Sequence, residues 1–201
     1  IDPTSKTITA SEVGVMTTLT DLARNSAPRN VAADIGRLFG EAIARKQDTD
    51  LTALFDGFSG GIGDGTAAIT AAKVFAAASD LRTASLNLNE CAVVLHPKIA
   101  YDLKANLTNT FANSNANDLA NEALRSGYVG QLAGLRIFET TNMSNTGNTG
   151  DYKGAAFHRD AIAYAGMQDL KIETQRDASL RADEIVATAV YGVSEVHDSY
   201  G

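Results

Sequence analysis

Three histidines are the side chains of this chain best suited to acid–base or metal chemistry near neutral pH. His96, His158 and His197 lie far apart in the sequence, each within or beside an expected strand. A zinc site needs three or four ligands that converge, and no His-x-His or His-x-x-x-His spacing favours this here. We therefore expect structural roles for all three, with His96 capping or packing against the helix that starts at Pro97.

Nucleophile and carboxylate patterns do not predict an active site either. No Gly-x-Ser-x-Gly elbow is present, and the triplet 158–160 (His-Arg-Asp) lacks the glycine-rich loop and Asp-Phe-Gly element that accompany it in kinases. One charged cluster could hold a catalytic carboxylate pair, although a solvated turn or intersubunit salt bridges suit it better. Its members are Glu173, Arg176, Asp177, Arg181, Asp183 and Glu184. We assign no catalytic residue and no metal ligand.

The glycine-rich segment 58–65 (FSGGIGDG) differs from the phosphate-binding loops. A P-loop needs a Lys after its last Gly, whereas here Asp64 brings negative charge and no Lys is near. The dinucleotide pattern G-x-G-x-x-G fails because Thr66 stands where the third Gly belongs. Glycines so dense favour a flexible joint, and we expect no cofactor.

Composition excludes several classes of protein. With 44% hydrophobic and 20% charged residues, the chain has the composition of a globular domain rather than a disordered segment. A formal charge of −7 argues against a protein that grips nucleic acid over its whole surface. A local basic face would have to come from Arg24, Arg29, Arg37, Arg45 and Lys46.

Neither a disulfide nor a membrane span is expected. Cys91 is the single cysteine and begins an apolar run, so we expect a small buried hydrophobe rather than a reactive thiol. No apolar segment approaches the roughly 18 residues that a span requires, and no signal peptide is seen. The chain opens Ile-Asp-Pro without Met, which indicates processing or an incompletely recorded longer protein.

The first half of the chain predicts helices. Thr9-x-x-Glu12 matches a capping box, and Val13, Met16, Leu19 and Leu22 follow at roughly helical spacing. A longer amphipathic helix is expected over about 27–46, its apolar stripe formed by Val31, Ile35, Leu38, Phe39, Ala42 and Ile43. An alanine-rich third helix is expected at about 66–82.

The second half predicts strands and two polar loops. A buried strand at 92–95 leads through His96-Pro97 into a short helix, and further strands are expected near 131–139 and 154–158. Residues 170–175 alternate strictly, which predicts one buried face, and 185–196 is apolar enough for a strand covered on both faces. The Asn-rich segments 106–121 and 140–153 are expected to be solvated loops.

The order and spacing of five segments carry a family resemblance. These are the helix 27–46, V-V-L-H-P-x-x-x-x-D-L at 93–103, V-G-x-L-A-G-L-x-I-F at 129–138, A-F-H-R-D-A at 156–161 and I-E-T-Q-R-D at 172–177. Together they resemble the major capsid protein of tailed bacteriophages over most of the chain. The resemblance implies an α+β fold of the Hong Kong 97 type, with a long spine helix, peripheral-domain strands and a mixed α/β axial domain.

The resemblance also implies a domain plan. Residues 1–58 would form part of the peripheral domain with its spine helix, 59–65 the joint, 66–168 the axial domain, and 169–201 the return strands. The family's N-terminal arm and long two-stranded loop are not found here. Because some members cross-link subunits through a Lys on that loop, nothing about cross-linking carries over.

The implied function is assembly into an icosahedral shell rather than catalysis. The implied partners are further copies of the chain in pentamers and hexamers, with portal, scaffold or decoration proteins; the shell would enclose DNA without sequence-specific binding and without a membrane. Assembly would take place in the bacterial cytoplasm and the product would be the virion. The candidate contact residues are Arg37, Glu41, Arg45, Asn113, Asn115, Asn142, Asn145, Asn148, Arg176 and Arg181.

Three alternatives remain open at the level of sequence. An encapsulin-type nanocompartment shares the fold and would differ in its cargo. A monomeric binding module would fit the Asn-rich loops but would not explain the long helix. An enzyme of the α+β class would need a convergent polar pocket, for which the sequence offers no candidate.

Overall fold

The computed structural model describes residues 5–26, 30–63, 67–111, 130–143 and 152–201. Contacts within the chain divide it into two compact units. Unit 1 comprises residues 1–51 and 163–194, and unit 2 comprises 52–162 and 195–201. Each unit has its own sheet and its own hydrophobic core.

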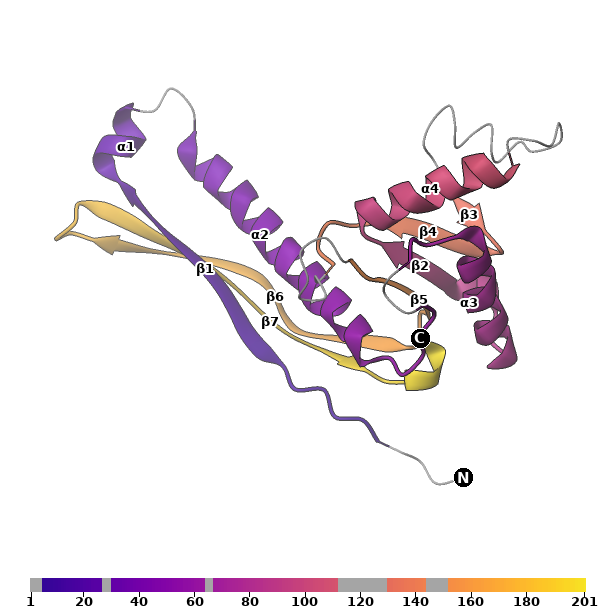
Figure 1. Cartoon of the computed structure of the whole chain (residues 1–201). Helices are drawn as coiled ribbons and strands as arrows, with labels where there is room; N and C mark the ends of the chain where they lie inside the picture. Colours follow the sequence, from indigo (N-terminus) through magenta and orange to yellow (C-terminus); the bar gives the residue numbers. More distant parts are fainter. Residues whose placement is uncertain (1–4, 27–29, 64–66, 112–129, 144–151) are drawn as a thin grey trace. The chain divides into compact units, whose positions relative to one another are not determined.

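Unit 1 is a long three-stranded sheet covered by one long helix (Figure 1). Its strands are β1 (Ser11–Thr20), β6 (Ile162–Asp177) and β7 (Ala182–Glu195), in the order β1-β7-β6. A short helix, α1 (Asp21–Ser26), follows β1, and α2 (Val31–Ala53) lies along the sheet. The core between α2 and the sheet consists of Leu19, Phe39, Ile43, Ile185, Ala187, Ala189 and Tyr191.

The helix predicted from the capping box is wrong: this segment is strand β1. It pairs antiparallel with β7 along its whole length, from Ser11 opposite Tyr191 to Thr20 opposite Ala182. Alternate residues of β1 are covered by α2, whereas Met16, which the helical spacing placed in a core, is 62% exposed. A period of two therefore describes these residues better than the helical period.

The predicted spine helix is confirmed with different bounds. It begins at Val31 and ends at Ala53, beyond the expected end near residue 46. Phe39 and Ile43 are buried against the sheet. Leu38 and Ala42, which the predicted stripe included, are exposed, so the apolar face of α2 is narrower than expected.

The two predicted return strands form, but their burial differs from the expectation. β7 is the central strand, and its alternate residues are buried under α2 while the intervening ones are only half-buried. It is therefore covered on one face, not both. β6 was expected to bury one face, yet nearly every one of its 16 residues is exposed.

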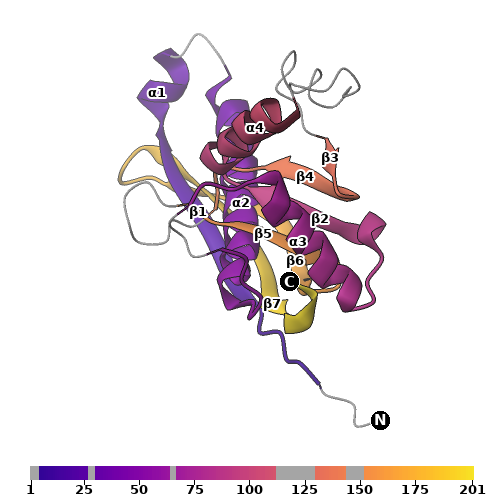
Figure 2. The ribbon, with the colours of Figure 1, turned by 45° about the vertical axis from the view of Figure 1, so that its right-hand side comes forward.

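Unit 2 is a four-stranded sheet with helices packed on it (Figure 2). The order is β3-β4-β2-β5, formed by Gln131–Leu132, Leu135–Glu139, Cys91–Leu95 and Gly154–His158. β2 and β4 are parallel, and the other pairings are antiparallel. Helices α3 (Ala71–Thr83) and α4 (Pro97–Phe111) share one core with these strands. Short 3-10 helices lie at Leu54–Gly57, Leu88–Glu90 and Asp198–Tyr200.

Local signals around β2 predict the structure well. The strand ends at Leu95 and α4 begins at Pro97, where a missing N–H costs nothing because first-turn amides have no partner within the helix. Cys91 is fully buried, as expected of a small hydrophobe, and burial raises the pKa of its thiol. α3 begins at Ala71, later than predicted, and the amide of Ala71 donates to Asn106 Oδ1 of α4 at 3.1 Å.

Candidate subunit-contact surfaces

The polar residues singled out in the sequence lie in structural contacts. His96 Nδ1 accepts a hydrogen bond from the Lys98 amide at 3.2 Å, and its ring stacks on Tyr152 with centroids 3.6 Å apart. The predicted capping role of His96 is thereby confirmed. Burial, with a smaller effect of Lys98, lowers the pKa of this histidine, which favours the neutral ring that can accept this bond.

His158 closes the turn after β5. Its Nδ1 accepts from the Asp160 amide at 3.2 Å, and its Nε2 lies 3.6 Å from Glu90 Oε2. Arg159 also pairs with Glu90, at 3.0 Å. Within the described residues, no three His, Cys, Asp or Glu side chains are grouped so that they could hold a metal ion.

The charged cluster near the tip of the β6–β7 hairpin is a network of ion pairs within the chain. Both guanidinium NH groups of Arg176 contact Asp21 at 2.7 Å, one of them also contacts Asp183 at 3.2 Å, and Arg24 pairs with Asp183 as well. Hydrogen bonds from Arg176 hold the pKa of both carboxyls below the ordinary value of 3.8. Asp177 caps the turn by accepting from the Ser179 amide at 2.8 Å.

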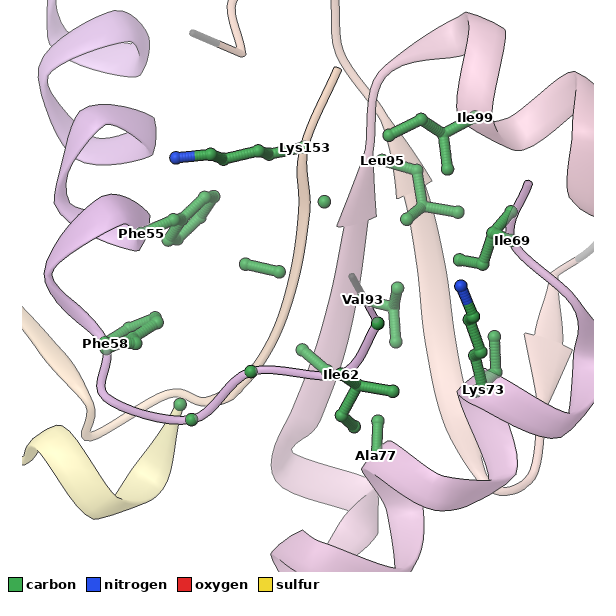
Figure 3. A pocket seen from close by; sticks show the side chains of 18 of the residues that line it. Phe55, Phe58, Ile62, Ile69, Lys73, Ala77, Val93, Leu95, Ile99 and Lys153 are labelled. Carbon is green, nitrogen blue, oxygen red and sulfur yellow. The ribbon is translucent and has the colours of Figure 1, made fainter. Parts of the chain in front are cut away.

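A cavity of about 1080 Å³ lies in unit 2 (Figure 3). Its walls carry aromatic and aliphatic side chains, among them Phe55, Phe58 and Val93. Three lysines line it, and each contacts another residue of the chain: Lys153 donates to Asp56 at 2.8 Å, Lys73 donates to the carbonyl of Ala67 at 3.4 Å, and Lys98 Nζ lies 4.9 Å from the centroid of the Tyr152 ring.

The predicted contact residues fall into three groups. On the exposed side of α2, Arg37 and Glu41 form a helical i,i+4 salt bridge of 3.0 Å beside the exposed Arg45. Arg176 is engaged in the ion pairs above, and the carbonyl of Arg181 accepts from the Asp21 amide at 3.0 Å.

The remaining candidates belong to the two polar loops. The Asn142 carbonyl accepts from the Thr52 hydroxyl at 3.0 Å. Asn113, Asn115, Asn145 and Asn148 lie outside the described residues. Whether any of the ten residues meets a neighbouring subunit stays a prediction.

The most distinctive surface, the apolar surface of β6, was not predicted from the sequence. Tyr164 (49% exposed), Met167 (80%), Leu170 (43%) and Ile172 (47%) lie along this strand. Exposed apolar side chains gathered on one element are typical of a surface that another molecule covers. The alternation of residues 170–175 predicted a strand, but it did not predict that side chains on both faces of this strand would be exposed.

Comparison with known proteins decides the family. The family model for phage capsid protein matches residues 4–201. The chain belongs to this family. In keeping with that, a solved structure from Mycobacterium phage Che8 matches with a TM-score of 0.78 and 26% identity, covering 94% of this chain and 68% of that one. No curated protein matches the chain.

More distant structures share the fold of this capsid protein. The capsid structure of cyanophage P-SCSP1u matches with a TM-score of 0.77 at 18% identity, covering 100% of this chain and 76% of that chain. The holo-SrpI encapsulin complex of Synechococcus elongatus matches with a TM-score of 0.67 at 12% identity, covering 95% of this chain and 71% of that one.

These matches confirm two expectations from the sequence. The fold is the mixed helix-and-sheet fold of the Hong Kong 97 type, and the chain is a shell-forming structural subunit of a phage capsid. In the part of the chain that the structure describes, none of the helices combines the length and apolarity needed to cross a bilayer.

Proposed function

We propose that this capsid protein assembles into pentamers and hexamers of a closed icosahedral shell that encloses the DNA genome of a tailed phage. The observation that carries the proposal is the family match over residues 4–201 together with the Che8 likeness. Symmetry multiplies each contact in a closed shell, so modest interfaces suffice for a stable particle. The subunit acts through its surfaces, and no catalytic role is proposed.

The net charge fits a shell that holds DNA without binding it tightly. At −7, the subunit repels phosphate overall, which keeps the lining from trapping the genome. Copies of the chain are the principal partners, with portal, scaffold or decoration proteins added during assembly in the host cytoplasm. The finished location is the virion.

The domain roles are part of the same proposal. Unit 1, with the long helix α2, fits a peripheral domain, and unit 2 fits an axial domain whose polar loops crowd the five-fold and six-fold axes. The segment 59–65, which lies within unit 2, would let the subunit adapt to the different curvatures of pentamers and hexamers. Deleting residues 142–150 should spare the folding of the subunit and impair capsomer formation, and normal assembly of this variant would contradict the axial placement.

Electron microscopy and sedimentation of the full-length protein test the function directly. Uniform closed shells that protect DNA from nuclease are expected. Closed shells filled with protein cargo instead of DNA would favour an encapsulin-type compartment. A monodisperse species that stays a monomer under all assembly conditions would contradict the capsid function.

A further inference from the structure

The unit 1 sheet has two edge strands, β1 and β6, and β6 is the longer of the two. β6 is hydrogen-bonded to β7 on one side, and on its other side no described strand is paired with it. The strand is 16 residues long and exposed along nearly all of its length. An edge of this kind presents a row of unpaired N–H and C=O groups, which is a template for pairing with another strand.

Folded proteins usually protect such an edge, and the protection of β6 is limited to its charged side chains. Edge strands are commonly short or carry proline, and the segment 162–177 is neither short nor interrupted by proline. Apolar side chains point from both of its faces, with Met167 80% exposed and Leu170 43% exposed. A partner that supplies both backbone hydrogen bonds and apolar cover therefore fits this edge best.

We propose that the free edge of β6 pairs antiparallel with β6 of a second copy, with Leu170 of the two copies opposite each other on a twofold axis. This pairing rests on the proposed assembly function, because it would be one of the contacts between subunits of the shell. An antiparallel pair of identical strands is isologous, so each favourable contact occurs twice.

The charges on the edge choose the register. Asp169 makes no ion pair with any residue that the structure describes, while Lys171 pairs with Glu173 of the same strand at 2.5 Å. With Leu170 on the axis, each Asp169 lies directly opposite the second copy's Lys171. Opposite charges at such cross-strand positions stabilise a sheet, and like charges destabilise it.

Neighbouring registers leave Asp169 opposite an uncharged residue or another carboxylate. With the axis at Lys171, the two lysines would face each other, and each Asp169 would face the second copy's Glu173. Both kinds of contact place like charges together. An axis at Ile172 would also give two attractive pairs, with Lys171 opposite the second copy's Glu173, but it would leave Asp169 opposite the uncharged Gln175. A shift by one residue also changes which side chains meet on each face, so the register is specified by more than one contact.

Cysteine cross-linking of assembled shells tests the pairing. In the full-length protein, Leu170→Cys should give a disulfide-linked dimer on mild oxidation, because directly opposed residues have Cα atoms about 4.5–5.5 Å apart, within reach of a disulfide. Ile172→Cys and Thr174→Cys are matched controls on the same exposed face. In the proposed register their symmetry mates are about 13 Å and 27 Å away, too far to cross-link. The native Cys91 is 0% exposed and should not compete.

A charge series tests the register without cysteine. Asp169→Lys should raise the protein concentration needed for assembly roughly tenfold, because two attractive pairs become repulsive. The triple variant Asp169→Lys, Lys171→Asp, Glu173→Lys inverts the whole row and should restore assembly to near the original level.

The outcomes separate this proposal from the proposed function. Shells that form without a dimer at position 170, or with a dimer at 172 instead, overturn the pairing while leaving the capsid function intact. Failure of the triple variant to recover assembly also overturns the register. A wild-type protein that forms no shells contradicts both.

Discussion

Unit 1 and unit 2 solve the problem of burying a sheet in different ways. In unit 2, two helices share one core with the sheet, and the fully buried Cys91, Leu95 and Leu135 lie at its centre. In unit 1, the core follows a single line under α2, and β6 is exposed along most of its length, although Tyr164 near its start stacks on Tyr191. The difference teaches that the described part of unit 2 buries its sheet under helices of the same chain, whereas unit 1 leaves an apolar strand exposed, which we propose is covered by assembly.

The largest expected effect is the loss of stability when a buried side chain of the unit 2 core is shortened. Leu135→Ala should lower the free energy of unfolding by about 2–5 kcal/mol, since Leu135 is 0% exposed and a cavity would replace it. Denaturant unfolding of the unassembled subunit measures this. The matched control is Leu170→Ala on β6, expected within about 0.5 kcal/mol of wild type because the site is open. An equal loss of unfolding free energy in the two variants would contradict the proposed difference in burial between the two units.

A smaller effect is expected at the turn between β3 and β4. Gly134 has φ +86° and follows Ala133 at φ 56°, as a two-residue hairpin with both central residues left-handed requires. Gly134→Ala should cost about 1–2 kcal/mol because a Cβ disfavours this conformation. Thermal unfolding of the subunit is the measurement. Gly61→Ala, where an added Cβ would meet nothing within 4 Å, is the control and should be nearly neutral.

The ion-pair network of unit 1 predicts a dependence on acid. Arg176 lowers the pKa of Asp21 and Asp183, so both carboxyls contribute stability above their ordinary pKa of 3.8. This contribution is lost as pH falls through the lower folded values. The melting temperature should therefore fall below about pH 4 in wild type, and by a smaller amount in Arg176→Gln, which has already lost the pairs. Because the pairs are exposed, added salt should reduce the difference between the two proteins. An identical acid profile for both would contradict the role of Arg176.

The smallest change in the stability of the unassembled subunit is expected for a substitution on the exposed surface of β6. Met167→Ser removes an apolar side chain that is 80% exposed, so the unassembled subunit should unfold within about 0.5 kcal/mol of wild type. Shell assembly should nevertheless weaken, because the proposed pairing places Met167 directly opposite Glu173 of the second copy and buries part of its side chain there. Unchanged assembly would count against β6 as a contact surface; a destabilised subunit would show that Met167 already packs within the chain.

What could be predicted from the sequence follows from the range of the interactions involved. The end of β2 and the start of α4 were predicted correctly because Pro97 and His96 act on their immediate neighbours, but α4 continues to Phe111, through residues 106–111 that were expected to belong to a loop. β1 was mistaken for a helix because Val13, Met16 and Leu19 fit a helical spacing as readily as a strand. The pairing with β7 decides the matter: its first pair, Ser11 with Tyr191, joins residues 180 positions apart in the sequence, and no local pattern predicts it.

The contact surfaces were harder to predict for a related reason. The candidate contact residues were chosen for polarity and position, and several of them already have partners within the chain, among them Arg37, Glu41, Asn142, Arg176 and Arg181. The open strand β6 was found only when the structure showed which of its side chains remain exposed. Alternation along 170–175 predicts a strand, but burial depends on what packs against it, which one chain's local sequence does not encode.

Hydrogen exchange of free subunits and assembled shells tests the central claim most directly. The account predicts that amides of β6, over Ile162–Asp177, exchange rapidly at alternate positions in the free subunit and become protected in the shell, while amides of β2 are protected equally in both states. β6 amides that are already protected in the free subunit, or that remain unprotected in the shell, would contradict the claim that unit 1 is completed by assembly.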